Sequence, residues 1–230
     1  MRPARRPRLY FSFRSPYSWL TVHRLRAAVP DAFEALDWFP YWDPDERTQA
    51  DLVDRQAEFH YVQMSRAKHL YLLLDTKRLS QQLGVPMAWP VDVDPWWELP
   101  HLGFLAARRA GRGPEFYDAI VAARWQRGED ICTPDVVRAA AREAGVDPDL
   151  VAGAPDSPEI RAAAVDCLVA AYEDDIFGIP YLRVGRHRFW GYDRLDAFLA
   201  AWRPEATPPP PVPVPVLAGA YDTDTAGGCG

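Results

Sequence analysis

One short stretch places hydroxyl groups where a chain could stabilise a thiolate. The aromatic run Leu9–Phe13 predicts a strand, and the residues from Tyr17 onward predict a helix that follows it directly. Ser15 takes the N-cap position of that helix and Pro16 its first position. Free N–H groups and the helix dipole favour negative charge at such a start. Ser15 could therefore donate a hydrogen bond to the thiolate of a bound small-molecule thiol.

The same residues also have a purely structural explanation. A serine at an N-cap satisfies an orphan backbone N–H, and a proline loses nothing at the first helical position. Neither Ser15 nor Ser18 can form a disulfide, which makes a thiol–disulfide oxidoreductase the least favoured enzyme. On this turn alone, a simple helix cap is the favoured interpretation, and a site needs support from the rest of the chain.

Composition limits the possible partners. The chain has 230 residues, a net charge of -6 and a pI near 5.4, so nothing favours binding to nucleic acid or to an anionic membrane. No apolar run approaches the roughly 18 residues of a membrane span. The five histidines lack the spacing of metal ligands, so we expect no metal site. A small-molecule substrate is the remaining class of partner.

Cysteine use and the basic arm bear on the compartment. The three cysteines, Cys132, Cys167 and Cys229, form no C-x-x-C pair and are odd in number, which indicates reduced thiols. The basic arm Arg2–Arg8 is followed by no apolar segment of the kind that signal peptides carry. We therefore expect a cytoplasmic protein.

The elements that must position Ser15 follow from apolar periodicity and turn residues. A second strand is predicted over 33–39 and is ended by Pro40. Residues 43–60 are predicted to form a loop, which leads into the next helix. A hairpin with the turn Gly185-Arg186 comes late in the chain. Helices are predicted over 16–28, 63–83, 100–111, 114–127, 133–145, 157–172 and 194–202, and the hairpin strands over 177–184 and 187–190.

This order predicts an α/β protein with a thioredoxin-like fold and an inserted all-helical domain. The thioredoxin-like domain is discontinuous and comprises residues 8–42 and 175–203, and the helical insertion domain comprises 43–174. Residues 204–230 begin with a polyproline II tract and are predicted to form a flexible tail.

In such a fold Ile179-Pro180 can have a second role. A cis bond there would turn the Ile179 backbone toward the helix start at Ser15, where it could pair with the backbone of a thiol tripeptide. The residues alone favour the alternative, a trans proline that opens an edge strand.

Four motifs in this order resemble the 2-hydroxychromene-2-carboxylate isomerases and the kappa-class glutathione transferases, of the DsbA-like thioredoxin superfamily. The resemblance covers roughly residues 8 to 203. The motifs are Ser15-Pro16-Tyr17-Ser18-Trp19-Leu20; Lys68-His69-Leu70-Tyr71 with Asp75, Lys77 and Gly84-Val85-Pro86; Glu129-Asp130-Ile131 before Thr133-Pro134; and Phe177-Gly178-Ile179-Pro180 with Phe189-Trp190-Gly191-Tyr192-Asp193-Arg194-Leu195.

The resemblance implies glutathione or another low-molecular-weight thiol as cofactor. Ser15 would hold the thiol sulfur, and Ile179 with cis Pro180 would hold the cysteinyl backbone. Asp193 and the backbone around Tyr192 would take the γ-glutamyl end. By the same resemblance, Lys68 would reach a glutathione carboxylate, although a solvated surface lysine and a capping aspartate are the plain alternatives.

Other residues are candidates for a substrate pocket. They are Arg14, Tyr17, Trp89 and Trp190. The chain departs from the family pattern at Ser12, where an aspartate is usual, at Arg14, where a small or apolar residue is usual, and at Tyr192, where a small polar residue is usual. We expect these changes to crowd or recharge the mouth of the thiol site.

The resemblance implies a thiol-assisted isomerase that acts on a conjugated unsaturated carbonyl or an aromatic-derived compound. Two alternatives stay open, a kappa-like glutathione transferase and a non-catalytic thioredoxin-like binding module. The relatives imply a homodimer.

Overall fold

The computed structural model of the chain describes residues 6–60 and 64–203. The tail predicted for 204–230 and Cys229 lie outside the described residues. The helices are α1 (Pro16–Ala28), α2 (Ala32–Ala35), α3 (Glu46–Asp54), α4 (Arg66–Gln82), α5 (Glu98–Arg109), α6 (Gly113–Val121), the π-helix η1 (Ala122–Gln126), α7 (Pro134–Glu143), α8 (Pro148–Ala152), the short η2 (Ala154–Asp156), α9 (Pro158–Glu173), the short η3 (Tyr192–Arg194) and α10 (Leu195–Trp202).

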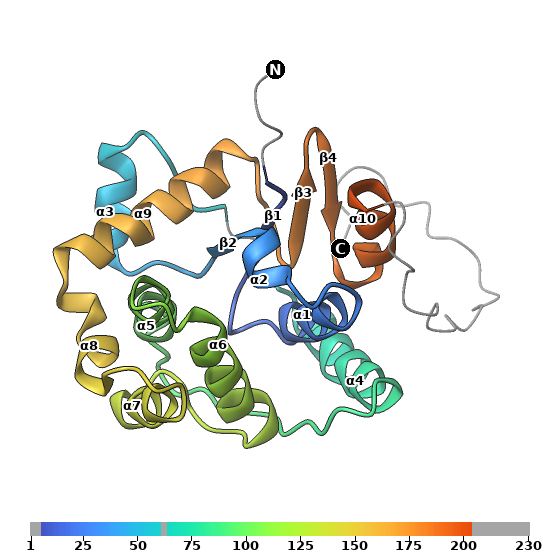
Figure 1. Ribbon diagram of the computed structural model, residues 1–230, viewed down its shortest axis with the longest axis horizontal. Helices are drawn as coiled ribbons and strands as arrows, with labels where there is room; N and C mark the ends of the chain where they lie inside the picture. The colour runs from blue at the N-terminus through green and yellow to red at the C-terminus, as the bar shows by residue number, and fades with distance from the viewer. Residues whose placement is uncertain (1–5, 61–63, 204–230) are drawn as a thin grey trace.

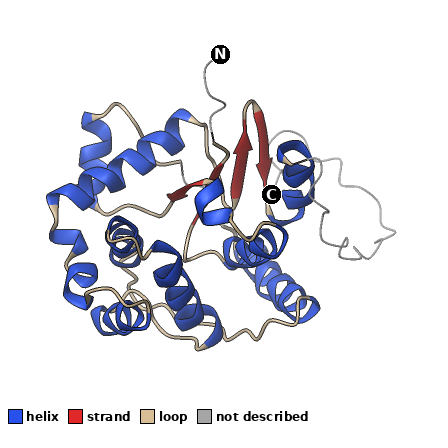
Figure 2. Cartoon of the chain, in the orientation of Figure 1, coloured by secondary structure: helices blue, strands red, loops and turns tan. Residues whose placement is uncertain are grey.

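A four-stranded mixed sheet organises these helices (Figures 1 and 2). The strands are β1 (Arg8–Phe11), β2 (Asp37–Pro40), β3 (Tyr181–Val184) and β4 (His187–Trp190), in the order β2-β1-β3-β4. β1 runs parallel to β2, and β3 runs antiparallel to both β1 and β4. The sheet, the helix after β1 and the late hairpin confirm the predicted thioredoxin-like fold. The division into two domains stays a prediction.

Aromatic packing fixes the end of β1, from which the chain continues to Ser15. Phe11 is fully buried, and its ring meets those of Phe13, Phe104 and Tyr117 edge-on at centroid distances of 5.5, 5.3 and 5.6 Å. Edge-to-face pairs of this kind stabilise a core beyond their buried area. The sheet is thereby joined to α5 and α6, and the first residues of the β1–α1 loop start from a rigid position.

Three predicted elements differ from the structure, and one of them is the strand predicted over 177–184, which begins only at Tyr181. The strand over 33–39 begins only at Asp37, because Phe33 lies on the short helix α2 and stacks on Trp38 at 4.1 Å. The loop predicted after residue 43 contains α3, capped by Asp45, whose carboxylate accepts from the Thr48 N–H at 2.8 Å. Only Thr48 and Leu52 of α3 are buried, too few to give a readable helical period.

Buried charges join the strands whose ends carry the candidate site. Asp174 follows α9, and its carboxylate accepts from the Tyr10 hydroxyl at 2.6 Å and from Arg8 on β1 at 2.8 Å. Arg183 on β3 donates to the same carboxylate. Burial opposes ionisation of Asp174, but the bonds from Tyr10 and Arg8 and the two guanidinium charges hold the pKa of Asp174 below its ordinary value.

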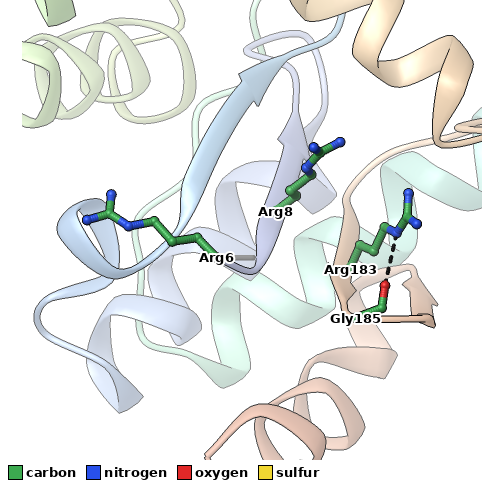
Figure 3. Close-up of a pocket in the computed structure, with 4 residues that line it drawn as sticks. All are labelled: Arg6, Arg8, Arg183 and Gly185. Atoms are coloured by element: carbon green, nitrogen blue, oxygen red, sulfur yellow. Dashed lines mark hydrogen bonds between the residues drawn. The ribbon is translucent and has the colours of Figure 1, made fainter. Parts of the chain in front are cut away.

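A small basic pocket lies beside this cluster (Figure 3). Arg8 and Arg183 extend from neighbouring strands, Arg183 Nε donates to the Gly185 carbonyl at 3.3 Å, and Arg6 points away from both. The cavity of about 40 Å³ has room for only a few water molecules. It lies at the start of β1, whereas Ser15 follows the end of that strand, so the pocket is not part of the candidate site.

Replacing Asp174 tests the cluster. We expect Asp174→Asn to lower the free energy of unfolding at pH 7 by about 1–3 kcal/mol, measured by urea denaturation. The native pKa of Asp174 is depressed, so its stabilisation is present above the unfolded-state pKa and is lost as the pH falls through the native pKa. The difference between wild type and variant should therefore shrink in acid.

Asp175→Asn is the matched control, because Asp175 is exposed and, among residues 6–60 and 64–203, forms an ion pair with Arg188 alone. An equal loss of stability in both variants would contradict the role given to Asp174.

Candidate functional site

Ser15 is the N-cap of α1, as predicted. Its Oγ accepts the Ser18 N–H at 3.1 Å, and its backbone is extended with φ -93° and ψ 116°. The side chain is half-buried, and its proton has no acceptor within residues 6–60 and 64–203. Because the oxygen is engaged from the helix side, the O–H is free to donate to a ligand at the helix start.

Ser18 has a different role from Ser15. It is fully buried, and its Oγ accepts the backbone N–H of Ser12 at 3.3 Å. The two serines in the thiol slots are therefore not equivalent: Ser18 fixes the loop before α1, and Ser15 faces outward from it.

A buried histidine, missed by the sequence analysis, fixes the same loop. His101 on α5 is fully buried, and its Nδ1 lies 2.7 Å from the Trp97 carbonyl oxygen. A carbonyl only accepts, so Nδ1 carries the proton. Nε2 accepts the Phe13 N–H at 3.1 Å, and Ser12 Oγ lies 3.1 Å from the same nitrogen. His101 is therefore neutral and holds Ser12 and Phe13 in place.

The surroundings of His101 keep it uncharged. Burial is the main cause that lowers the pKa of His101 to about 3; the bond to the Trp97 carbonyl opposes the shift, and the charge of Arg124 adds to it. Trp42 stacks on the ring at 5.3 Å. The only sequence signal was a histidine four residues after Trp97 on a helix with apolar faces, which is more often a core residue than a functional one.

Arg14 and Arg124 both lie against Trp97. The guanidinium of Arg14 lies 5.7 Å from the ring centroid of Trp97, and that of Arg124 lies 4.9 Å from it. Arg124 is buried and forms a two-pronged ion pair with Asp92, at 2.7 and 2.9 Å. Arg14 is exposed and forms no ion pair with any described residue. The candidate site thus has an unpaired cation next to Ser15.

Three tryptophan rings, one of them on α1, contact one another in a row next to the candidate site. Trp19, one turn after Ser15, stacks on Trp125 at 5.9 Å, and the rings of Trp89 and Trp125 form a T-shaped contact at 5.8 Å. Trp125 belongs to the π-helix η1, a distortion that is common at functional sites. Trp89 remains 41% exposed. It joins the aromatic cluster that starts on α1, and its place in a substrate pocket stays a prediction.

Tyr17 connects α1 to α4. Its hydroxyl donates to Asp75 at 2.7 Å, and Asp75 also pairs with Arg78. Burial, followed by the bond to Asp75, raises the pKa of Tyr17 well above its ordinary value. Tyr17 therefore stays protonated at neutral pH, and its proton is committed to Asp75, which the sequence analysis quoted in a motif but gave no role.

The Ile179-Pro180 peptide bond is cis, so the trans form favoured by the residues alone is wrong. β3 lies between β1 and β4 and is not an edge strand. The Pro180 carbonyl accepts the Gly191 N–H at 3.0 Å. Trp190 packs over Gly178, where an added Cβ would lie 2.6 Å from the indole nitrogen. Trp190 thus covers the backbone immediately before Ile179.

The three residues expected at the ends of a thiol tripeptide differ in exposure. Tyr192 is buried with its ring 4.9 Å from the Arg24 guanidinium, so its side chain is turned inward and does not crowd the site. Asp193 is exposed and, within the described part of the chain, pairs with its neighbour Arg194 alone, at 3.0 Å. Lys68 is exposed near the start of α4 and forms no ion pair with any described residue.

The described cysteines are unsuited to replace the missing thiols. Burial, followed by the charge of Asp130, raises the pKa of Cys132 to about 12, and burial raises that of Cys167 to about 11. Both therefore stay protonated at neutral pH. No group of three or more His, Cys, Asp or Glu side chains that could hold a metal ion occurs in the described part of the chain. Likewise, none of its helices is long and apolar enough to cross a membrane.

Comparisons with known proteins agree with the fold. Residues 8–203 match the DSBA-like thioredoxin domain. A 2-hydroxychromene-2-carboxylate isomerase from Sphingobium xenophagum is 25% identical over 192 residues, which cover 81% of this chain and 92% of the relative. A solved 2-hydroxychromene-2-carboxylate isomerase superposes with a TM-score of 0.67 at 22% identity, covering 85% of this chain and 93% of its own. The cytosolic disulfide reductase DsbM from Pseudomonas aeruginosa, solved with GSH, has a TM-score of 0.53 at 15% identity and covers 79% of this chain and 87% of its own.

Replacing His101 tests its part in the site. We expect His101→Leu to lower the free energy of unfolding at pH 7 by about 1–3 kcal/mol, because leucine offers no acceptor to the buried Phe13 N–H. The native pKa of His101 lies below its unfolded value, so wild type loses stability as the pH falls from about 6.5 toward 3, by up to about 1.4 kcal/mol per pH unit.

The variant lacks this contribution, so its stability should fall less steeply over that range. Urea denaturation of both proteins at several pH values measures the slopes. Equal slopes would contradict a neutral, buried His101.

Proposed function

Because this chain belongs to the DsbA-like thioredoxin domain family, we propose that it is a thiol-assisted isomerase of a conjugated unsaturated carbonyl compound. The observation that supports this most is the half-buried hydroxyl of Ser15 at the start of α1. Its oxygen accepts the Ser18 N–H, and its proton is left available. Such a group stabilises a thiolate without taking part in redox chemistry.

The residues present fit a thiol tripeptide such as glutathione. The exposed Asp193 carboxylate is suited to an ammonium group, and the exposed Lys68 to a carboxylate. The Ile179 backbone precedes a cis proline, and Trp190 covers the residue before it. Ser15 would hold the sulfur. A bound thiolate would supply a nucleophile that adds to the β-carbon, so that the double bond becomes rotatable, and its departure with the same electron pair restores the alkene without redox change.

The chain's own residues would contribute charge stabilisation and orientation. Ser15 donates to the thiolate, and the free N–H groups of α1 favour its negative charge. Arg14 is the unpaired cation next to Ser15, so it would bind an anionic group of the substrate. The Trp89 side chain, 41% exposed, suits a flat, unsaturated compound. His101 acts indirectly, because it fixes the loop that carries Arg14 and Ser15.

Removing the Ser15 hydroxyl tests the proposal. We expect Ser15→Ala to weaken glutathione binding at neutral pH roughly 10- to 100-fold, measured by isothermal titration calorimetry, because a hydrogen bond to a charged group is lost. Turnover of a conjugated aryl enone, followed by its ultraviolet absorbance in the presence of glutathione, should fall by a similar factor.

Ser157→Ala is the matched control. Ser157 is also an N-cap serine, on α9, and its Oγ accepts the Ile160 N–H at 3.4 Å. Loss of either cap is expected to cost about 1 kcal/mol of stability, but only the Ser15 variant should lose thiol binding. No glutathione binding by wild type, or equal binding by all three proteins, would contradict the proposal. Consumption of one thiol for each substrate would indicate a transferase instead.

A further inference from the structure

The helix α4 exposes its apolar stripe to solvent. Spacing at three and four residues predicts one apolar face, which a surface helix normally buries. In the structure only Thr76 and Ser80 of α4 are buried. The exposed fractions of the stripe residues are 47% for Leu70, 58% for Tyr71 and 62% for Leu74. Adjacent exposed apolar residues of this size mark a surface that binds a partner.

The charges of α4 indicate what kind of partner would fit. The helix carries four Lys and Arg residues and one acid, Asp75. Asp75 is already paired with Arg78, whereas Arg66, Lys68 and Lys77 form no ion pair with any described residue. Two copies of α4 packed together would bring like charges close, which is unfavourable. The partner should therefore combine apolar residues with acidic ones.

The C-terminal segment of the same chain has this composition. Its apolar part is Pro208–Leu217, in which valine alternates with proline over Val212–Val216. Its charged residues are all acids, namely Glu205, Asp222 and Asp224. Proline-rich segments also recognise surfaces with exposed aromatic rings, which Tyr71 provides here.

The segment is long enough to reach α4. Arg203 pairs with Asp31 at 3.0 Å, just beyond the C-terminal end of α1. The other end of α1 touches α4 through Tyr17 and Asp75. α1 has 13 residues and is about 20 Å long, and the stripe lies within about 10 Å of Asp75 along α4. At about 3.1 Å per residue, 204–213 alone would span about 31 Å.

We propose that residues 208–224 of this chain pack on the exposed stripe of α4, with Val212–Leu217 against Leu70, Tyr71 and Leu74. Asp222 and Asp224, which follow Leu217, would then lie along the basic helix α4. This intramolecular contact would cover the apolar surface of α4 beside Asp75, the residue that holds Tyr17 at the start of α1. The inference does not depend on the proposed function.

Hydroxyl-radical footprinting of the full chain, read by mass spectrometry, tests the contact. Leu150 on α8 is a matched internal reference, because it is 48% exposed and Leu70 is 47% exposed. In the wild-type protein we expect Leu70 to be oxidised several-fold more slowly than this reference, and Tyr71 to be oxidised several-fold more slowly than the same residue in the variant V212S/V214S/V216S. In the variant V212S/V214S/V216S, Leu70 and Leu150 should be oxidised at the same rate. These substitutions replace no residue of the hydrophobic core within 6–60 and 64–203, so we expect the variant to fold like the wild-type protein.

A second comparison separates the possible occupants. Equal oxidation of Leu70 and Leu150 in wild type would overturn the proposal, as would protection of Leu70 that persists in the triple variant. Protection that disappears on dilution would show that a second copy of the chain covers the stripe, and would also overturn it. Protection that is independent of protein concentration but weakens in D222N/D224N would support the acidic contact with α4.

Discussion

The candidate site depends on how the chain turns between β1 and α1. Within a few residues it must leave a buried strand, expose Arg14, keep Ser15 half-buried and start a helix. The backbone N–H groups of that turn have no strand or helix partners, and buried N–H groups need acceptors. Ser18 supplies one to Ser12 and His101 supplies one to Phe13. These two buried side chains therefore determine where the Ser15 hydroxyl points.

The same requirement explains why His101 must stay neutral. A protonated imidazole would have no lone pair for the Phe13 N–H and would place a charge in a fully buried position. Trp97 connects this internal bond to the surface, because its carbonyl accepts from His101 and its ring contacts Arg14. The neutral state of His101, the packing of Trp97 and the position of Arg14 therefore depend on one another. A substitution at any of these three residues would disturb the other two.

Sequence reasoning recovered the parts of the molecule with local signals. The Ser15 cap, the strand before it and the late hairpin follow from turn residues and periodicity, and the order of elements was enough to infer the fold. The roles of His101, Asp75 and Trp97 depend on contacts across 58 to 89 positions of sequence, for which one sequence carries no signal. Tyr192 was expected to crowd the site, but it packs inward against Arg24. The predicted homodimer and cytoplasmic location stay predictions.

The central claim is that Ser15 and the start of α1 keep a bound thiol ionised. The most direct test is a pH titration of glutathione bound to the protein, followed by the ultraviolet absorbance of the thiolate, in wild type and in Ser15→Ala. The account predicts that the bound thiol has a pKa below that of free glutathione in wild type, and that the pKa rises toward the free value in the variant. A bound thiol with an unshifted pKa, or the same shift in both proteins, would contradict it.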